Sequence, residues 1–177
     1  MSSVQSSSVQ IGFVGLGRMG GNMVHRIHRD SAHRVVAFDP DGEAVARAEA
    51  VGATGANSLE QLVEQLAAPR MVWIMVPAGE ITQSTVDKLA ELLEPGDTII
   101  DGGNSRWTDD KARSALLEPK GIDYIDVGTS GGVWGLEVGY CMMTGGPDAA
   151  MARLAPILDV LAPPATEEHG PGWQHMG

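Results

Sequence analysis

The chain has 177 residues, of which 12 are Lys or Arg and 23 are Asp or Glu, so its formal net charge is −11. Hydrophobic residues make up 43% of it, which is enough for the core of one domain. The acidic excess argues against a nucleic acid partner, because phosphate backbones are bound by clustered Lys and Arg. We expect no membrane association either, since no apolar run approaches the ~20 residues that span a bilayer.

Taken in chain order, apolar runs alternate with amphipathic segments. We predict a strand at 9–14, a helix at 18–28, a strand at 34–38, a helix at 41–51, a strand at 54–56 and a helix at 59–66. A strand at 70–76, a helix at 81–93, a strand at 98–100, a helix at 108–117, strands at 123–127 and 140–144, and a helix at 147–161 follow.

This alternation is typical of βαβ units. We therefore predict an α/β fold of the Rossmann-like, doubly wound type, with a mostly parallel sheet and helices on both faces. Residues 9–161 form the predicted Rossmann-like domain, and residues 1–8 a flexible Ser-rich arm without the features of a secretory signal. Residues 162–177, which contain Pro163-Pro164 and Gly170-Pro171-Gly172, are predicted to be a linker without a further element.

The single cysteine, Cys141, cannot form an internal disulfide, which favours a reducing, cytoplasmic setting. It lies in an apolar run, so we expect it to be buried like a small hydrophobic residue. The helix that carries His25 and His28 also carries Arg26 and Arg29, and we expect these residues to form a solvated face. No metal-ligand spacing is present, so we predict no metal site.

The segment Gly15-Leu16-Gly17-Arg18-Met19-Gly20 is a GxGxxG motif that follows the first predicted strand and opens the first predicted helix. In this context the first glycine permits a tight turn, the second lets the backbone approach a pyrophosphate, and the third lets the helix pack on the sheet. The helix N-terminus offers free N–H groups to the phosphates. The alternative is a glycine turn without a ligand.

Asp39 ends the second predicted strand, 19 residues after Gly20, which matches the spacing expected for the acidic residue of the motif. Its carboxylate would accept hydrogen bonds from the adenosine ribose and repel a 2′-phosphate. Because Pro40-Asp41-Gly42 offers no Arg, the sequence favours NAD over NADP as cofactor. Asp39 could also be a helix N-cap.

Three further segments follow predicted strands, where doubly wound sheets bind ligands. Val76-Pro77-Ala78-Gly79 suits a loop beneath a flat ligand, although a plain turn would look similar. Asp101-Gly102-Gly103-Asn104-Ser105 offers the amide of Asn104, with helix capping by Asn104 or Ser105 as the alternative. Gly128-Thr129-Ser130-Gly131-Gly132 could cradle an anion or sugar acid, with Trp134 either in the pocket wall or in the core.

Oxidation of an alcohol needs a base within hydrogen-bond reach of the hydroxyl. We expect Lys88, Lys111 and Lys120 to be solvated and far from the strand ends, and His175 lies close to the end of the chain. No convincing base is therefore present, and we assign no catalytic residue, with Asn104 in a supporting role.

With these motifs the chain resembles the 6-phosphogluconate dehydrogenases over Val9 to Gly177. VGLGRMGGNM (14–23), MVPAG (75–79), DGGNS (101–105) and SGG (130–132) occur in the family's order, and DGGNS is the most specific of them. The resemblance implies oxidative decarboxylation of 6-phosphogluconate to ribulose 5-phosphate with NAD(P). It also implies that Asn104, Ser130, Gly131 and Gly132 contact the sugar acid, and that Met19, Val76 and Ala78 lie near the cofactor.

Two departures from the family matter. Asp39-Pro40-Asp41 replaces the Asn-Arg-Ser/Thr segment of NADP-specific members and resembles the NAD-preferring bacterial branch. The family's catalytic Lys and Glu, and the helical domain that completes the site and the homo-oligomer, lie beyond Gly177. We therefore expect this chain to fold but to be inactive alone. A β-hydroxyacid dehydrogenase of the 3-hydroxyisobutyrate type, or a dinucleotide-binding module without catalysis, remains an alternative.

Overall fold

The computed structural model describes residues 8–166, 168 and 170–177, apart from the side chain of Val133. Except for Ser8, the predicted N-terminal arm lies outside these residues. The strands are β1 (Gln10–Val14), β2 (Arg34–Phe38), β3 (Thr54–Gly55), β4 (Met71–Ile74), β5 (Thr98–Asp101), β6 (Asp123–Ser130), β7 (Cys141–Gly145) and β8 (Trp173–His175). The helices are α1 (Arg18–Asp30), α2 (Gly42–Ala50), α3 (Leu59–Glu64), α4 (Glu80–Leu92), α5 (Trp107–Leu117), α6 (Gly135–Val138) and α7 (Asp148–Leu161), with 3-10 turns at Glu118–Lys120 and Gly132–Trp134.

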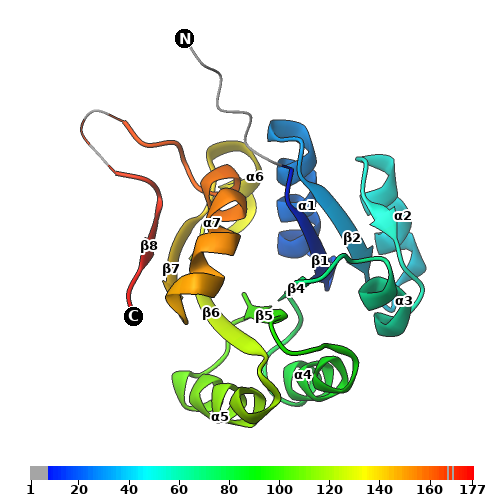
Figure 1. Ribbon diagram of the computed structural model, residues 1–177. Helices are drawn as coiled ribbons and strands as arrows, with labels where there is room; N and C mark the ends of the chain where they lie inside the picture. Colours follow the sequence, from blue (N-terminus) through cyan, green and yellow to red (C-terminus); the bar gives the residue numbers. More distant parts are fainter. Residues whose placement is uncertain (1–7, 167, 169) are drawn as a thin grey trace.

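These strands form one eight-stranded sheet in the order β3-β2-β1-β4-β5-β6-β7-β8 (Figure 1). The first six strands in this order, β3, β2, β1, β4, β5 and β6, run parallel to one another. β7 runs antiparallel to β6, and β8 runs parallel to β7. The order reverses between β1 and β4, which is the point where doubly wound sheets open a binding crevice. The predicted Rossmann-like fold is therefore confirmed.

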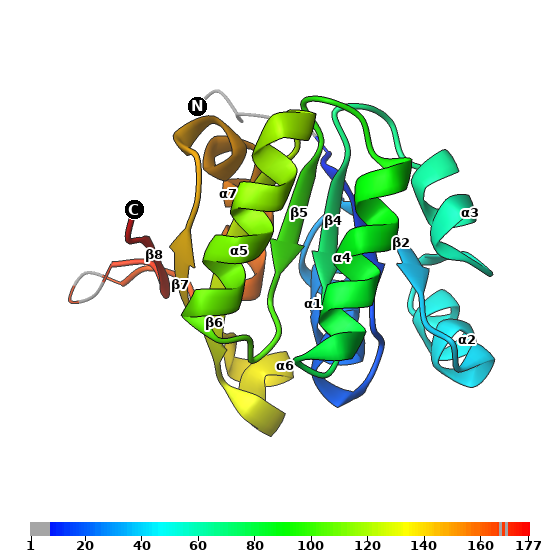
Figure 2. The same ribbon diagram turned by 90° about the horizontal axis from the view of Figure 1, so that it is seen from below.

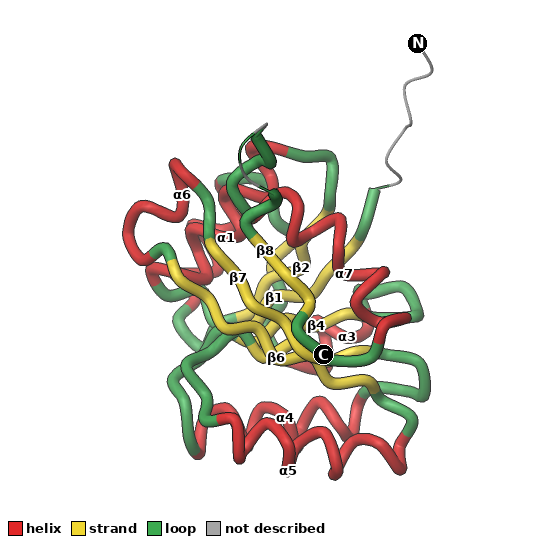
Figure 3. The backbone as a smooth tube through the Cα atoms, turned by 90° about the vertical axis from the view of Figure 1, so that its left-hand side faces the viewer, coloured by secondary structure: helices red, strands yellow, loops and turns green. Residues whose placement is uncertain are grey.

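Both faces of the sheet are covered. Apolar residues of α1, α2 and α7 pack on one face, and those of α3, α4 and α5 pack on the other. Figure 2 shows α4 and α5 side by side across their face, and Figure 3 shows the sheet between them and α7. This arrangement explains the unbroken apolar strands, since in β4 Trp73 joins one core and Val72 the other.

The segment after Ala162 differs from the prediction. Trp173 to His175 form β8, so residues 162–177 are not a linker devoid of secondary structure. Trp173 packs partly against the α1 and α7 core, and its indole N–H donates to Asp159 at 2.8 Å. The Gly and Pro residues before it predict a loop, whereas the strand is stabilised by its pairing with β7, which lies far away in the sequence.

Arg26 also differs from the prediction of a solvated face. It is 6% exposed, and its guanidinium donates to the carbonyl oxygens of Val160 (2.9 Å), Leu136 (3.0 Å), Glu137 (3.3 Å) and Ala162 (3.3 Å). It thereby ties α1 to α6 and to the end of α7. His25 and His28 on the same helix are half-buried.

Candidate functional site

The glycine turn between β1 and α1 is shaped by close backbone packing. Gly15 has φ +93°, and a Cβ there would lie 2.5 Å from the carbonyl oxygen of Met75. A Cβ on Gly20 would overlap the carbonyl oxygen of Gly15. A Cβ on Gly17 would meet nothing within 4 Å, so the backbone faces open space there. The turn thus fits a bound pyrophosphate, with two glycines required by packing and one left open to the ligand.

Asp39 lies beside this turn and is half-buried. Its Oδ2 accepts a hydrogen bond from the N–H of Leu16 at 2.7 Å, and its Oδ1 accepts one from the N–H of Asp41 at 2.8 Å. Each carboxylate oxygen keeps acceptor capacity for a ribose hydroxyl. The alternative role as an N-cap is wrong, because α2 is capped by Asp41, which accepts from the N–H of Glu43 at 3.0 Å.

Arg47, which the sequence reasoning overlooked, reaches this region from α2. Its Nη2 lies 3.6 Å from Oδ2 of Asp41, and its side chain is 65% exposed. It lines a cavity of about 340 Å³ that Leu16 and Arg18 also line. Arg47 lies six residues after Asp41, the N-cap of α2, so it is not among the residues next to Asp39 in the sequence.

A larger cleft of about 970 Å³ opens at the carboxyl ends of β1, β4, β5 and β6. Eight of the predicted site residues line it: Gly17, Arg18, Met19, Gly20, Val76, Pro77, Asn104 and Ser130. Six others lie outside its walls: Gly15, Leu16, Asp39, Ala78, Gly131 and Gly132. The glycine turn, Asn104 and Ser130 therefore share one cavity although they come from distant parts of the chain.

The loop after β5 carries Asn104, which is exposed in the cleft. Neither Asn104 nor Ser105 caps the next helix, because α5 begins at Trp107 after Arg106 without a side-chain cap. The hydroxyl of Ser105 instead donates to Oδ2 of Asp101 at 2.7 Å. The capping alternative for this loop is therefore wrong.

The segment expected to be a loop at residues 128–132 is partly strand. β6 extends to Ser130, which pairs with Cys141 of the antiparallel β7. Only after Ser130 does the chain turn, with Gly131 at φ +149° and Gly132 at φ +49°. The antiparallel partner explains the extra strand length, which a run ending in small polar residues did not reveal.

Cys141 is exposed and lines the cleft, so the prediction of a buried residue is wrong. In β7 the residues alternate, with Met142 and Thr144 buried and Cys141 and Met143 facing outward. An apolar run does not bury every residue here, because β7 is buried on alternate positions only. Trp134 is likewise exposed, by 71%, and is not a core residue.

Carboxyl groups that the sequence reasoning missed also reach the cleft. Asp110 of α5 and Asp126 of β6 line it together with Asn104. Burial raises the pKa of Asp110, although the hydrogen bond from the Tyr124 hydroxyl opposes this shift. Burial also raises the pKa of Asp126, and the neighbouring Asp101 adds to the rise. The only sequence signal was the alternation that puts Tyr124 and Asp126 on one side of β6.

No Lys or His lines the cleft among the described residues. Lys88 pairs with Glu60 at 2.8 Å, the Lys120 ammonium donates to the carbonyl of Ala90 at 3.0 Å, and Lys111 lies over the ring of Trp107. His175 is held in β8, with Nε2 2.8 Å from the carbonyl oxygen of Gly146.

Within the described part of the chain, no group of three His, Cys, Asp or Glu side chains could hold a metal ion. None of the described helices is long and apolar enough to cross a membrane.

Residues 10–170 match the family described as the NAD binding domain of 6-phosphogluconate dehydrogenase. The chain is 42% identical over 169 residues to the NAD(+)-dependent, decarboxylating 6-phosphogluconate dehydrogenase of Haloferax volcanii, covering 96% of this chain and 54% of that protein. It is 39% identical over 162 residues to the decarboxylating enzyme of Treponema pallidum, covering 89% and 33%. The chain thus spans about half the length of the first relative and a third of the second.

Solved structures of two kinds of dehydrogenase also superpose on the chain. The 6-phosphogluconate dehydrogenase of Plasmodium falciparum superposes with a TM-score of 0.84 at 28% identity, over 95% of this chain and 37% of that one. The 3-hydroxyisobutyrate dehydrogenase of Mycobacterium tuberculosis superposes with a TM-score of 0.81 at 28% identity, over 95% and 54%. By its sequence match over residues 10–170, the chain belongs to the family of NAD-binding domains of 6-phosphogluconate dehydrogenase.

Proposed function

We propose that this chain supplies the cofactor-binding site and one wall of the sugar-acid site of an NAD-preferring 6-phosphogluconate dehydrogenase. The observation that supports this most is the cleft of about 970 Å³, which Gly17, Asn104 and Ser130 line together. The reaction proposed for the complete enzyme is oxidation of 6-phosphogluconate at C3, loss of CO₂ and protonation of the enediol to ribulose 5-phosphate.

The cofactor would be held by groups along the first half of the sheet. Gly17 and the N-terminus of α1 would receive the pyrophosphate, and Asp39 the ribose hydroxyls of the adenosine. Met19, Val76, Pro77 and Ala78 would contact the nicotinamide end. When bound, the nicotinamide supplies a hydride acceptor.

The sugar acid would be held by Asn104 and Ser130. The Asn104 amide can donate and accept hydrogen bonds at once, which suits a hydroxyl group next to the reacting carbon. The Ser130 hydroxyl and the N–H groups of Gly131 and Gly132 would bind the carboxylate or a neighbouring hydroxyl. These residues bind and orient the substrate, and none of them is a base for its hydroxyl proton.

We therefore propose that the 177 residues alone bind NAD but do not turn over. The described walls of the cleft offer no Lys or His, and a general base typically contributes about 10²–10⁴ in rate. A homo-oligomer formed through a further helical domain, and a cytoplasmic location, belong to the same proposal.

Calorimetric titration with NAD and NADP, and an assay for NADH formation from 6-phosphogluconate, test this function. We expect saturable binding with NAD the tighter ligand, and no NADH from the 177-residue chain. A longer chain that includes the segment with the catalytic Lys and Glu should form NADH. Turnover by the short chain at ordinary rates of ~1–10³ per second would refute the assignment of the base.

The similarity to a 3-hydroxyisobutyrate dehydrogenase keeps a second activity open, with a β-hydroxyacid as substrate. Assaying the longer chain with 6-phosphogluconate and 3-hydroxyisobutyrate side by side separates the two. A preference for the smaller acid would replace the proposal, and NAD binding without either activity would favour a binding module.

A further inference from the structure

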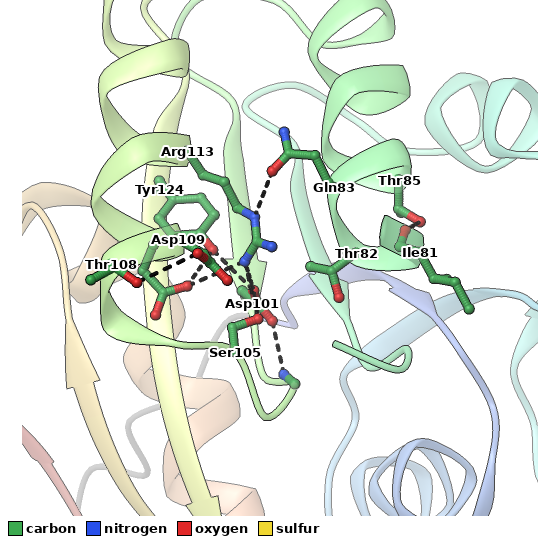
Figure 4. A network of polar contacts seen from close by, with 12 residues as sticks. Ile81, Thr82, Gln83, Thr85, Asp101, Ser105, Thr108, Asp109, Arg113 and Tyr124 are labelled. Atoms are coloured by element: carbon green, nitrogen blue, oxygen red, sulfur yellow. Dashed lines mark hydrogen bonds and ion pairs between the residues drawn. The ribbon is translucent and has the colours of Figure 1, made fainter. Parts of the chain in front are cut away.

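A buried arginine lies behind the wall of the cleft that carries Asn104. Arg113 of α5 is 2% exposed, and its Nη1 donates to Oδ2 of Asp101 and to Oγ of Ser105, both at 3.0 Å. Its Nε donates to Oε1 of Gln83 on the neighbouring helix α4 at 3.2 Å. Figure 4 shows the guanidinium reaching from α5 toward the end of β5. Arg113 thus fastens two helices to the last residue of a strand.

The partner of Arg113 organises the loop that follows that strand. Asp101, at the end of β5, is 2% exposed, and its Oδ1 accepts the N–H of Gly103 at 2.9 Å. Its Oδ2 accepts the Ser105 hydroxyl at 2.7 Å. Asn104 lies between these two residues, so one buried carboxylate holds the chain on both sides of the exposed amide.

The phenol of Tyr124 in β6 completes the cluster. Its oxygen lies 3.0 Å from Oδ2 of Asp101 and 3.0 Å from Oδ1 of Asp110, so it can donate to either carboxylate. Burial, together with the charge of Asp101, raises the pKa of Tyr124, and the phenol therefore stays a donor. A carboxylate this deeply buried needs such donors, because an unpaired buried charge is costly.

The start of the loop is fixed independently. The N–H of Gly102 donates to the carbonyl of Ile74 at 3.0 Å, and a Cβ on Gly102 would overlap the indole of Trp73. The loop therefore has a fixed entry, and the position of Asn104 beyond it depends on the contacts of Asp101.

We propose that Arg113, assisted by Tyr124, is a positioning residue that sets the Asn104 amide toward the sugar acid by fixing Asp101. This rests on the proposed function, in which Asn104 binds the substrate. Arg113 itself does not line the cleft, and it acts on the loop through Asp101 and Ser105. Its Nη1 also lies 3.4 Å from Oδ1 of Asp110.

The experiment compares Arg113→Met and Arg113→Lys with Arg153→Met in the 177-residue chain. Arg153 is a matched control, because its Nη2 donates to Thr98 (2.7 Å) and Asp123 (3.3 Å) at the opposite ends of β5 and β6. The readouts are the amide NMR signals of residues 103–105, including the Asn104 side chain, and titrations with NAD and then 6-phosphogluconate.

For Arg113→Met we expect shifted and broadened signals for residues 103–105. We also expect 6-phosphogluconate affinity to fall by about tenfold, while NAD affinity changes by less than about threefold. Arg113→Lys should restore part of the affinity, and Arg153→Met should leave the signals and both affinities as they were. Unchanged loop signals in folded Arg113→Met, or the same changes in Arg153→Met, would overturn the proposal.

If Arg113→Met does not fold, the same NMR signals are measured in Tyr124→Phe, which removes one hydroxyl from the cluster and keeps the ring. Unaltered signals for residues 103–105 in that variant would then count against the proposal, and displaced ones would support it. If the unaltered chain does not bind 6-phosphogluconate, the proposed function fails, but the loop signals still show whether Arg113 positions Asn104.

Discussion

The N–H of Leu16 donates a hydrogen bond of 2.7 Å to Oδ2 of Asp39, so the residue that follows β2 also holds the turn that follows β1. The two parts of the dinucleotide motif, which the sequence offers as separate signals 23 residues apart, form one unit. A change at Asp39 would therefore act on the glycine turn as well as on the proposed ribose contact.

Two substitutions at Asp39 separate its charge from its acceptor role. Asp39→Asn keeps an oxygen for the Leu16 N–H but removes the charge that opposes a 2′-phosphate, so the preference for NAD over NADP should shrink. Asp39→Ala loses the acceptor as well and should weaken NAD binding by about tenfold or more, since hydrogen bonds to charged groups contribute ~1.5–3 kcal/mol. Calorimetry with both dinucleotides measures both effects.

Arg47→Ala is the control, because Arg47 is the cation that lies 3.6 Å from Asp41 in the same region. The NAD affinity of this variant should match that of the unaltered chain. If the unaltered chain binds NADP more tightly, and Arg47→Ala reverses that order, then Arg47 rather than Asp39 sets the preference.

Gly17 and Gly20 should respond in opposite ways to replacement by Ala. A Cβ on Gly17 points into open space, so Gly17→Ala should keep its melting temperature but lose about tenfold or more in NAD affinity through overlap with the pyrophosphate. A Cβ on Gly20 overlaps the carbonyl oxygen of Gly15, so Gly20→Ala should unfold at a clearly lower temperature. Thermal unfolding with and without NAD distinguishes them, and equal loss of stability in both would contradict this account.

Arg26→Met should destabilise the fold strongly. The substitution fills similar space but leaves the carbonyl oxygens of Val160 and Ala162 without the Arg26 donor, whereas Leu136 keeps its hydrogen bond from Arg29. This loss should lower the free energy of unfolding by about 2–4 kcal/mol. Urea denaturation measures the change. Arg34→Met, at an exposed position in β2, should stay within about 0.5 kcal/mol of the unaltered chain. A similar loss in both variants would mean that the carbonyl contacts of Arg26 contribute little.

Asp126→Asn should change how stability depends on pH. Because burial raises the pKa of Asp126, its contribution to stability is present below the pKa of an unfolded Asp, about 3.9, and is lost as the pH rises through the folded-state pKa. The amide carries no such penalty, so Asp126→Asn should be more stable than the unaltered chain near pH 7. This advantage should disappear near pH 3.

Urea denaturation at the two pH values tests this, with Asp87→Asn on the exposed side of α4 as the control. The control should follow the unaltered chain at both values. A gain for Asp126→Asn that persists undiminished at the lower pH would show that the effect is not electrostatic.

The parts of the fold that sequence could predict are those whose signal is local. The GxGxxG turn at Gly15 to Gly20 and the N-cap at Ser58, which accepts from the N–H of Gln61 at 3.1 Å, follow from neighbouring residues alone. The unbroken apolar run around Trp73 predicts a strand that is buried on both faces, and its residues do join the cores on both sides of the sheet. Asn104 could be singled out because it follows a strand end after two glycines.

The remaining features depend on contacts between distant segments. Arg113 lies in a helix with Asp109, Asp110 and Lys111 nearby, so it resembles a solvated residue until the helix is placed over Asp101. Cys141 faces outward because β7 has a particular register with β6. β8 exists because β7 offers it an edge. No composition or periodicity within these segments carries such information.

The interior position of β1 in the sheet, with a neighbour on each side, bears on the order in which the chain can assemble. β1 pairs with β2, which follows soon after it, and with β4, which follows only after α2, β3 and α3. A nascent or truncated chain that stops before Met71 would carry β1 with one edge unpaired, next to the apolar side chains of Ile11 and Phe13. An open edge of that kind invites pairing with another chain, so translation through β4 is the step at which the risk of aggregation falls.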